Sequence, residues 1–108
     1  MSDKQFLGEF EELVLLAVLK LGDDGYGVTI AKVIEEATGK RVSIGALYTT
    51  LSRLEEKGLI SSWLGEATEE RGGRAKKHFK IEISGKQALQ SVHDVRGKLL
   101  GEPVPQFA

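Results

Sequence analysis

Apolar residues recur at helical spacing through most of the chain and predict four helices. The first covers residues 5–21, where an amphipathic beginning gives way to a stretch, 13–19, that is apolar on every side. The others are expected at 26–38, 44–57 and 84–100. Because a helix that is apolar all round must be covered all round, residues 13–19 indicate either a central core helix or a surface that a second subunit covers.

Between the third and fourth predicted helices the pattern changes to that of a β-hairpin. Residues 59–64 predict a short strand, and 74–83 predict a second one, in which apolar and charged residues alternate from Phe79 to Ile83. Alternation with a period of two is typical of a strand with one buried face. The predicted fold is therefore mainly α with a small β-hairpin, in the order helix-helix-helix-strand-strand-helix.

The third predicted helix has an unusual outward face. Ser43 is its expected N-cap and Gly58 its expected stop. Gly and Thr on a solvated face each cost roughly 0.5–1 kcal/mol in helix propensity relative to Ala. Their presence therefore indicates either a face that a ligand approaches closely, which small side chains permit, or a poorly optimised surface helix. The stripe expected to be buried is Ile44, Leu47, Leu51 and Leu54, and the opposite stripe is Gly45, Thr49, Ser52, Arg53 and Glu56.

The second and third predicted helices are joined by a short connection that contains Gly39, which is the sequence form of a helix-turn-helix. With the hairpin that follows, they predict a winged helix-turn-helix. Residues 71–86 hold six basic residues against one acid. The whole chain has a net charge of −1 and a pI of about 6.1, but affinity for phosphates depends on local Lys and Arg density rather than on the sum.

Composition excludes several classes of function. The chain has no cysteine, and its two histidines, His78 and His93, lack metal-ligand spacing, so neither a metal nor another cofactor is expected. No nucleophile–base spacing and no phosphate loop are present, so an enzyme is not expected. The longest apolar run, 13–19, is too short to cross a bilayer, and no signal-peptide pattern precedes it. The expected location is cytoplasmic, without membrane attachment.

From about Leu7 to Leu89 the sequence resembles the PadR family of bacterial transcriptional regulators. The resemblance rests on LVLLAVL in the first helix, Tyr26-Gly27, the segment GALYTTLSRLEEKGLI, and GRAKKHFKI in the hairpin. It implies a homodimeric repressor that binds double-stranded DNA at an inverted repeat, with half-sites about one helical turn or a multiple apart. Residues 1–83 would form the winged-helix domain, and 84–108 a short dimerisation helix and tail.

The DNA-binding residues expected under this resemblance lie in the third helix and the hairpin. Tyr48 would donate to phosphate, or else pack between the two helices as a half-buried tyrosine. Arg53 would touch phosphate or pair with Glu56. A solvated strand is the alternative for the basic hairpin. The full expected set is Ser43, Ala46, Tyr48, Thr49, Thr50, Arg53, Arg71, Arg74, Lys76 and Lys77.

The first and last helices would supply the dimer interface. Regulation would require a partner or a small-molecule effector, which no residue pattern identifies. Glu82 departs from the family's helix-capping threonine, which leaves Ser84 as the expected substitute cap. A rival hypothesis is a winged-helix adaptor that binds protein instead of DNA. The expected interface residues are Phe6, Phe10, Leu13, Ala17, Leu89, Val92, Arg96 and Leu99.

Overall fold

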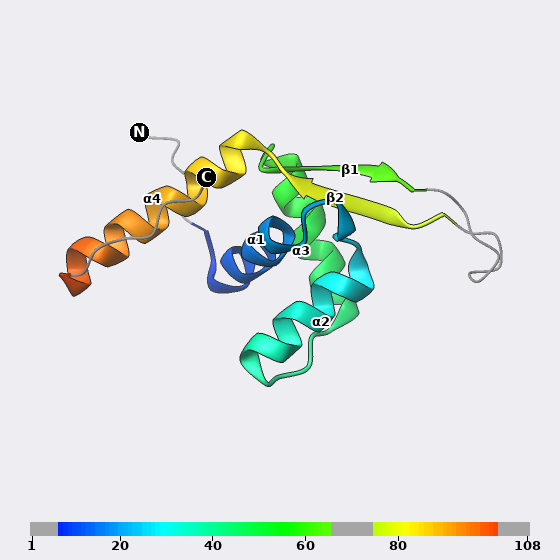
Figure 1. The fold of residues 1–108 in the computed structure, drawn as a ribbon, viewed down its shortest axis with the longest axis horizontal. Helices are drawn as coiled ribbons and strands as arrows, with labels where there is room; N and C mark the ends of the chain where they lie inside the picture. The colour runs from blue at the N-terminus through cyan, green and yellow to red at the C-terminus, as the bar shows by residue number, and fades with distance from the viewer. Residues whose placement is uncertain (1–6, 66–74, 102–108) are drawn as a thin grey trace.

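The computed structural model describes residues 7–65 and 75–101 of the 108-residue chain. Its order of elements confirms the predicted one, with a short 3-10 turn added after the first helix. The elements, shown in Figure 1, are α1 (Glu9–Leu21), η1 (Gly22–Asp24), α2 (Gly27–Thr38), α3 (Ile44–Glu56), β1 (Ile60–Leu64), β2 (Lys77–Ile81) and α4 (Ile83–Leu100).

Three helices form the body of the molecule, and the remaining elements extend from it in opposite directions. Helices α1, α2 and α3 pack on one another, with β1 and β2 beside them. The two strands pair antiparallel, with Ile60 opposite Ile81 and Leu64 opposite Lys77. Figure 1 shows this hairpin, the wing, running out on one side while α4 runs out on the other. The arrangement confirms the winged helix-turn-helix.

Helix α1 is the centre of the hydrophobic core. The chain's own elements bury Val14, Leu15, Ala17 and Val18, while Leu13, Leu16 and Leu19 are half-buried. This burial favours the central core helix over a helix covered mainly by a second subunit. It also corrects the expectation for Ala17, which lies in the chain's own core rather than at a dimer surface. The remaining core residues are Ile30, Ala31, Ile34, Leu47, Leu51, Leu54, Leu59, Ile60, Phe79 and Leu89.

The second strand is shorter than predicted because α4 begins earlier. The alternation of apolar and charged residues ends at Ile81, and Ile83 is an exposed residue in the first turn of α4. Glu82 occupies the N-cap position without a side-chain capping bond. Ser84 is not the cap either, since its hydroxyl donates to the Gly58 carbonyl at 2.6 Å. That bond fastens the start of α4 to the turn that ends α3.

Helix α4 is held against the body by apolar contacts of Leu89 and Ala88 and by polar contacts with Glu12 of α1. Leu89 is fully buried in the core, which corrects its expected place in a dimer interface. Further along, Arg96 Nη2 lies 2.7 Å from Glu12 Oε1, and His93 Nε2 lies 3.3 Å from Glu12 Oε2. Glu12 itself is buried. These polar contacts join the second half of α4 to the first turn of α1. Within the described ranges, no helix is long and apolar enough to span a membrane.

Candidate nucleic-acid interface

Helix α3 is anchored on one side and open on the other. Leu47, Leu51 and Leu54 are buried on its inner side. The Ser43 hydroxyl accepts a hydrogen bond from the Ala46 backbone N–H at 3.3 Å, which confirms the predicted N-cap. At the other end Gly58 adopts φ 76°, a left-handed conformation that other residues rarely adopt. The helix is thus defined at both ends and fixed from behind.

The outward face of α3 matches the predicted polar stripe. Gly45, Thr49, Ser52, Arg53 and Glu56 are all exposed, as are Ser43 and Ala46. Among the described residues no ion pair joins Arg53 to Glu56, and the exposed Arg53 guanidinium instead acts electrostatically on the Glu11 carboxylate of α1.

Two positions on α3 differ from expectation. Ile44 was predicted to be buried with the leucines but is 54% exposed, because it precedes the first turn that the body covers. Thr50, an expected DNA contact, is only 6% exposed and belongs to the buried side of the helix. It lies beside Leu51 on the side that faces the body, so it is removed from the proposed contact set.

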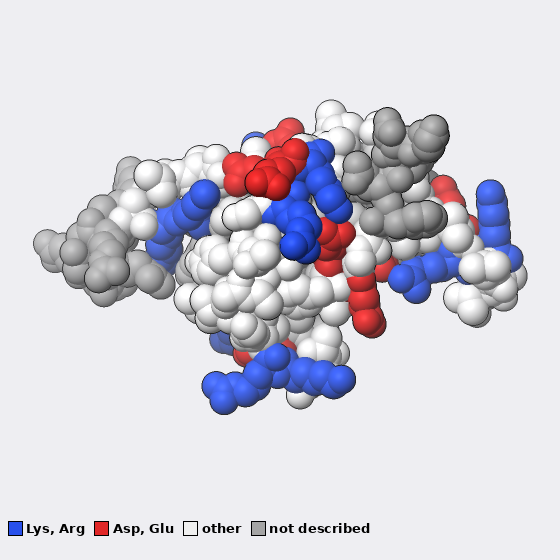
Figure 2. All heavy atoms as spheres, turned by 180° about the vertical axis from the view of Figure 1, so that it is seen from behind, with Lys and Arg blue, Asp and Glu red and all other residues white. Residues whose placement is uncertain are grey.

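The turn between α2 and α3 is ordered by side chains and carries positive charge. Glu35 Oε2 accepts the backbone N–H of Val42 at 2.7 Å, and the Thr38 hydroxyl accepts that of Lys40 at 3.1 Å. Lys40 and Arg41 are exposed. Figure 2 shows Lys and Arg side chains projecting at the lower edge of the molecule, the edge at which Figure 1 places this turn. The start of α3 is therefore flanked by cations.

Tyr48 connects α3 to the first residue of α2. Its ring and hydroxyl lie against Gly27, where any Cβ atom would overlap the hydroxyl. The side chain nevertheless remains 43% exposed. The two roles expected for Tyr48 are therefore compatible, since it packs between the helices and still has a surface that faces solvent.

A cluster of rings lies on the wing at the Trp63–His78 pair, one pair from the Leu64–Lys77 end of the strands. His78 lies between Trp63 and Tyr26, with ring centroids 5.2 and 5.3 Å away. The Lys76 ammonium lies 4.1 Å from the centroid of the Tyr26 ring, and His78 Nδ1 lies 3.2 Å from the Asp23 carbonyl oxygen. Such cation–π and ring contacts are attractive. The stack therefore fastens the wing to the start of α2.

The structure places only part of the predicted basic wing. Lys77 is exposed, whereas the half-buried Lys76 folds over Tyr26 instead of standing clear along the wing. Arg71 and Arg74 lie outside the described residues. Exposed Lys80 on β2 adds one further cation to the same hairpin.

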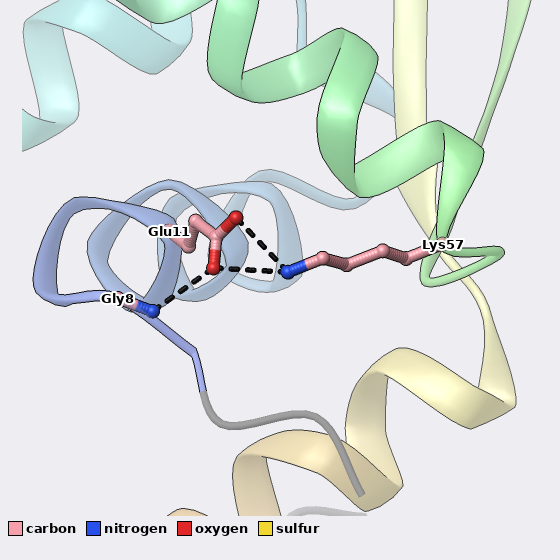
Figure 3. A network of polar contacts seen from close by, with 3 residues as sticks. All are labelled: Gly8, Glu11 and Lys57. Atoms are coloured by element: carbon pink, nitrogen blue, oxygen red, sulfur yellow. Dashed lines mark hydrogen bonds and ion pairs between the residues drawn. The ribbon is translucent and has the colours of Figure 1, made fainter. Parts of the chain in front are cut away.

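A polar contact at the far end of α3 joins it to the start of α1. Figure 3 shows the Glu11 carboxylate pointing from α1 toward Lys57, whose Nζ lies 3.2 and 3.0 Å from the two carboxylate oxygens. The Gly8 backbone N–H donates to Glu11 Oε1 at 2.9 Å. Burial alone would raise the pKa of Glu11, but the Gly8 N–H, the Lys57 ammonium and, to a smaller extent, the Arg53 guanidinium together hold the pKa below its ordinary value.

Comparison with known proteins identifies the family of the chain. A family model, the transcriptional regulator PadR-like family, matches residues 15–91, more than half of the chain. The chain belongs to the PadR-like family. Members of this family are DNA-binding transcriptional regulators, which are generally not enzymes. No curated protein sequence matches the chain significantly.

Solved structures of PadR-like proteins share the fold. A PadR-like transcription factor from Bacteroides fragilis is 26% identical, with a TM-score of 0.74 over 85% of this chain and 84% of that one. A PadR family regulator from Clostridium difficile is 25% identical, with a TM-score of 0.64 over 85% and 91% of the two chains. A third, from Bacillus cereus, is 22% identical with a TM-score of 0.68 over 85% and 84%, a likeness that concerns the fold alone.

The PadR-like fold also identifies surface residues that the sequence pattern missed. Lys40 and Arg41 are exposed just before the N-cap of α3 and are absent from the predicted set, although two consecutive cations ahead of a predicted helix are a usable signal for a phosphate-binding surface. Ile44 was expected in the core because its spacing from Leu47 fits the buried stripe. Across residues 7–65 and 75–101, no group of side chains is arranged to hold a metal ion.

Proposed function

We propose that this PadR-like chain represses transcription as a homodimer bound to an inverted-repeat operator, reading sequence with α3 and phosphates with the wing. The observation that carries the proposal is the outward face of α3, which is small or polar and exposed along its length while three leucines fix the helix from behind. A helix of this kind fits the major groove, because small side chains allow the backbone to approach the base edges.

The proposed contacts divide by chemistry. Ser43, Ala46 and Thr49 stand near the N-terminal end of α3, the end that a recognition helix presents to base edges. Tyr48, whose side chain is 43% exposed, donates its hydroxyl to a phosphate. Cations supply the remaining phosphate contacts: Arg53 on α3, Lys76 and Lys77 on the wing, and Arg71 and Arg74 from the sequence of the hairpin.

The proposed homodimer rests on the exposed apolar surface of α4. Leu99 is 83% exposed, and Val95 and Leu100 are exposed near it on the same helix. Apolar residues that gather at one end of a helix are typical of a subunit interface. The interface residues kept from the sequence are Phe10, Leu13, Val92, Arg96 and Leu99, with Phe6 outside the described residues.

A two-fold dimer presents two copies of α3 to the DNA, so its operator would be an inverted repeat. A small-molecule effector that changed the separation of the two helices would change operator affinity.

The test is fluorescence anisotropy of the purified protein with a labelled duplex from the region upstream of its own coding sequence, repeated over a range of salt concentrations beside an unrelated duplex. We expect preferential binding that weakens steeply with salt. In Arg74→Glu the slope of log K against log salt should fall by about 0.9 for each phosphate that the variant no longer neutralises. Lys20→Glu is the matched control, because it makes the same charge change at an exposed position of α1 that belongs neither to the proposed DNA contacts nor to the apolar end of α4.

Equal and salt-insensitive binding to both duplexes would contradict the proposal. So would an Arg74→Glu variant that binds as tightly as Lys20→Glu. Either result would favour the winged-helix adaptor that binds protein.

A further inference from the structure

The first two turns of α3 lack the side chains that usually read bases. Residues 43–50 are Ser, Ile, Gly, Ala, Leu, Tyr, Thr and Thr. Guanine is recognised by bidentate Arg or Lys, adenine by Asn or Gln, and cytosine by Glu or Asp. None of these residue types occurs before Arg53, near the far end of the helix. Discrimination between base pairs at this end must therefore come from hydroxyl groups and apolar contacts.

Ile44 is the largest apolar side chain exposed in the first turn of α3. It follows the N-cap directly and is 54% exposed, although its helical spacing would fit the buried leucines. Gly45 has no side chain and Ala46 has a single methyl group, so neither shields Ile44 from an approaching surface. The first residues of a recognition helix are the ones that meet base edges. Ile44 shares the stripe of Leu47, but it is exposed at the end of α3 that a recognition helix presents to base edges.

The charges around Ile44 favour DNA as the occupant of this surface. Lys40 and Arg41 are exposed in the turn that leads into α3, and the ordered turn holds them next to Ser43 and Ile44. Phosphates drawn to these cations would bring the major groove over the first turn of the helix. The thymine 5-methyl group is the apolar feature that a base pair displays in that groove.

We propose that Ile44 is a specificity-determining residue that contacts a thymine 5-methyl group in each half of the operator. This inference rests on the proposed function and specifies the base chemistry that the same helix reads. Val28 offers a contrast, because it is also exposed but belongs to the first turn of α2, the helix that crosses the backbone in a helix-turn-helix. Substitution of Val28 should therefore not change how DNA affinity depends on the thymine methyl group.

The test removes the 5-methyl group of thymine from the DNA and leaves the rest of the base unchanged. A preferred duplex is first selected from a random-sequence pool with the full chain, and each thymine in its half-sites is then replaced by deoxyuridine. Anisotropy should show that at least one symmetric pair of replacements weakens wild-type binding about fourfold per half-site, the value expected for burying one methyl group. In Ile44→Ser this difference should vanish, and in Val28→Ser it should persist.

The outcomes separate the inference from the proposed function. A preferred duplex whose binding is unchanged by every deoxyuridine replacement would overturn the role of Ile44 while leaving the DNA-binding function intact. A methyl effect of equal size in wild type and Ile44→Ser would overturn it too. If no preferred duplex emerges from the pool, the proposed sequence-specific function itself fails. Because Ile44 is exposed, circular dichroism of Ile44→Ser should match that of the wild type.

Discussion

At the scale of single residues, the contact between Tyr48 and Gly27 links the two helices of the helix-turn-helix. A Cβ atom at Gly27 would overlap the Tyr48 hydroxyl. We expect Gly27→Ala to lower the free energy of unfolding by about 1–3 kcal/mol, the range for overpacking a well-packed contact. The destabilisation should be smaller in a Tyr48→Phe background, where the overlapping oxygen is absent. Urea unfolding of the four proteins of this double-mutant cycle measures both effects.

Gly45 provides the control for that substitution. It lies within α3, and a Cβ atom there would have only the Ser43 hydroxyl nearby, at 3.9 Å. Gly45→Ala should therefore raise stability by about 0.5–1 kcal/mol through helix propensity alone. A destabilised Gly45→Ala would show that the effect of Gly27→Ala does not come from its contact with Tyr48.

At the scale of secondary-structure elements, the Glu11–Lys57 contact connects the start of α1 to the end of α3. Glu11→Gln removes the charge but keeps the shape of the side chain. We expect it to lower the free energy of unfolding by about 1–2 kcal/mol. This loss is smaller than that for breaking a fully buried ion pair, because Lys57 is partly exposed. Glu9→Gln, an exposed change in the same helical turn, should leave the denaturation midpoint unchanged.

The same contact predicts a dependence on pH. Folding lowers the pKa of Glu11 below its ordinary value of 4.5, so the folded chain favours the ionised carboxylate. Its contribution to stability is complete above that ordinary value and is lost as the pH falls through the lowered pKa. The stability difference between wild type and Glu11→Gln should therefore be largest near neutral pH and shrink in acid. A difference that stays constant down to strongly acidic pH would contradict the ion pair.

At the scale of the whole molecule, α4 projects from the body with its apolar end exposed. Leu99→Asp places a charge where the proposed dimer buries a leucine, and we expect it to weaken self-association roughly ten- to a hundredfold. Sedimentation equilibrium measures the change. Leu64→Asp is the control, because Leu64 is similarly exposed but lies on the wing, away from α4. Equal self-association of the two variants would place the interface elsewhere.

Periodicity predicted the order of elements because each helix and the hairpin must bury one side in so small a core. Periodicity gave the wrong burial for residues whose exposure depends on where they lie along the helix or on which side of it, and not on apolar spacing. Ile44 has the right spacing but precedes the covered part of α3, and Thr50 has a polar side chain yet lies on the covered side. Ala17 and Leu89 were expected to face a partner although the chain buries them itself. Neither the stack around His78 nor the Glu11–Lys57 contact has a sequence signal, since both join residues far apart in the chain.

The position of Trp63 also has an optical consequence. It is the only tryptophan in the chain, and its ring is stacked on the His78 imidazole on the wing, one pair from the Leu64–Lys77 end of the strands. Its fluorescence therefore reports on that place alone, and a change in the stack would alter its emission through contact quenching. The protein thus carries a built-in optical probe, through which movement of the wing could be followed without attaching a dye.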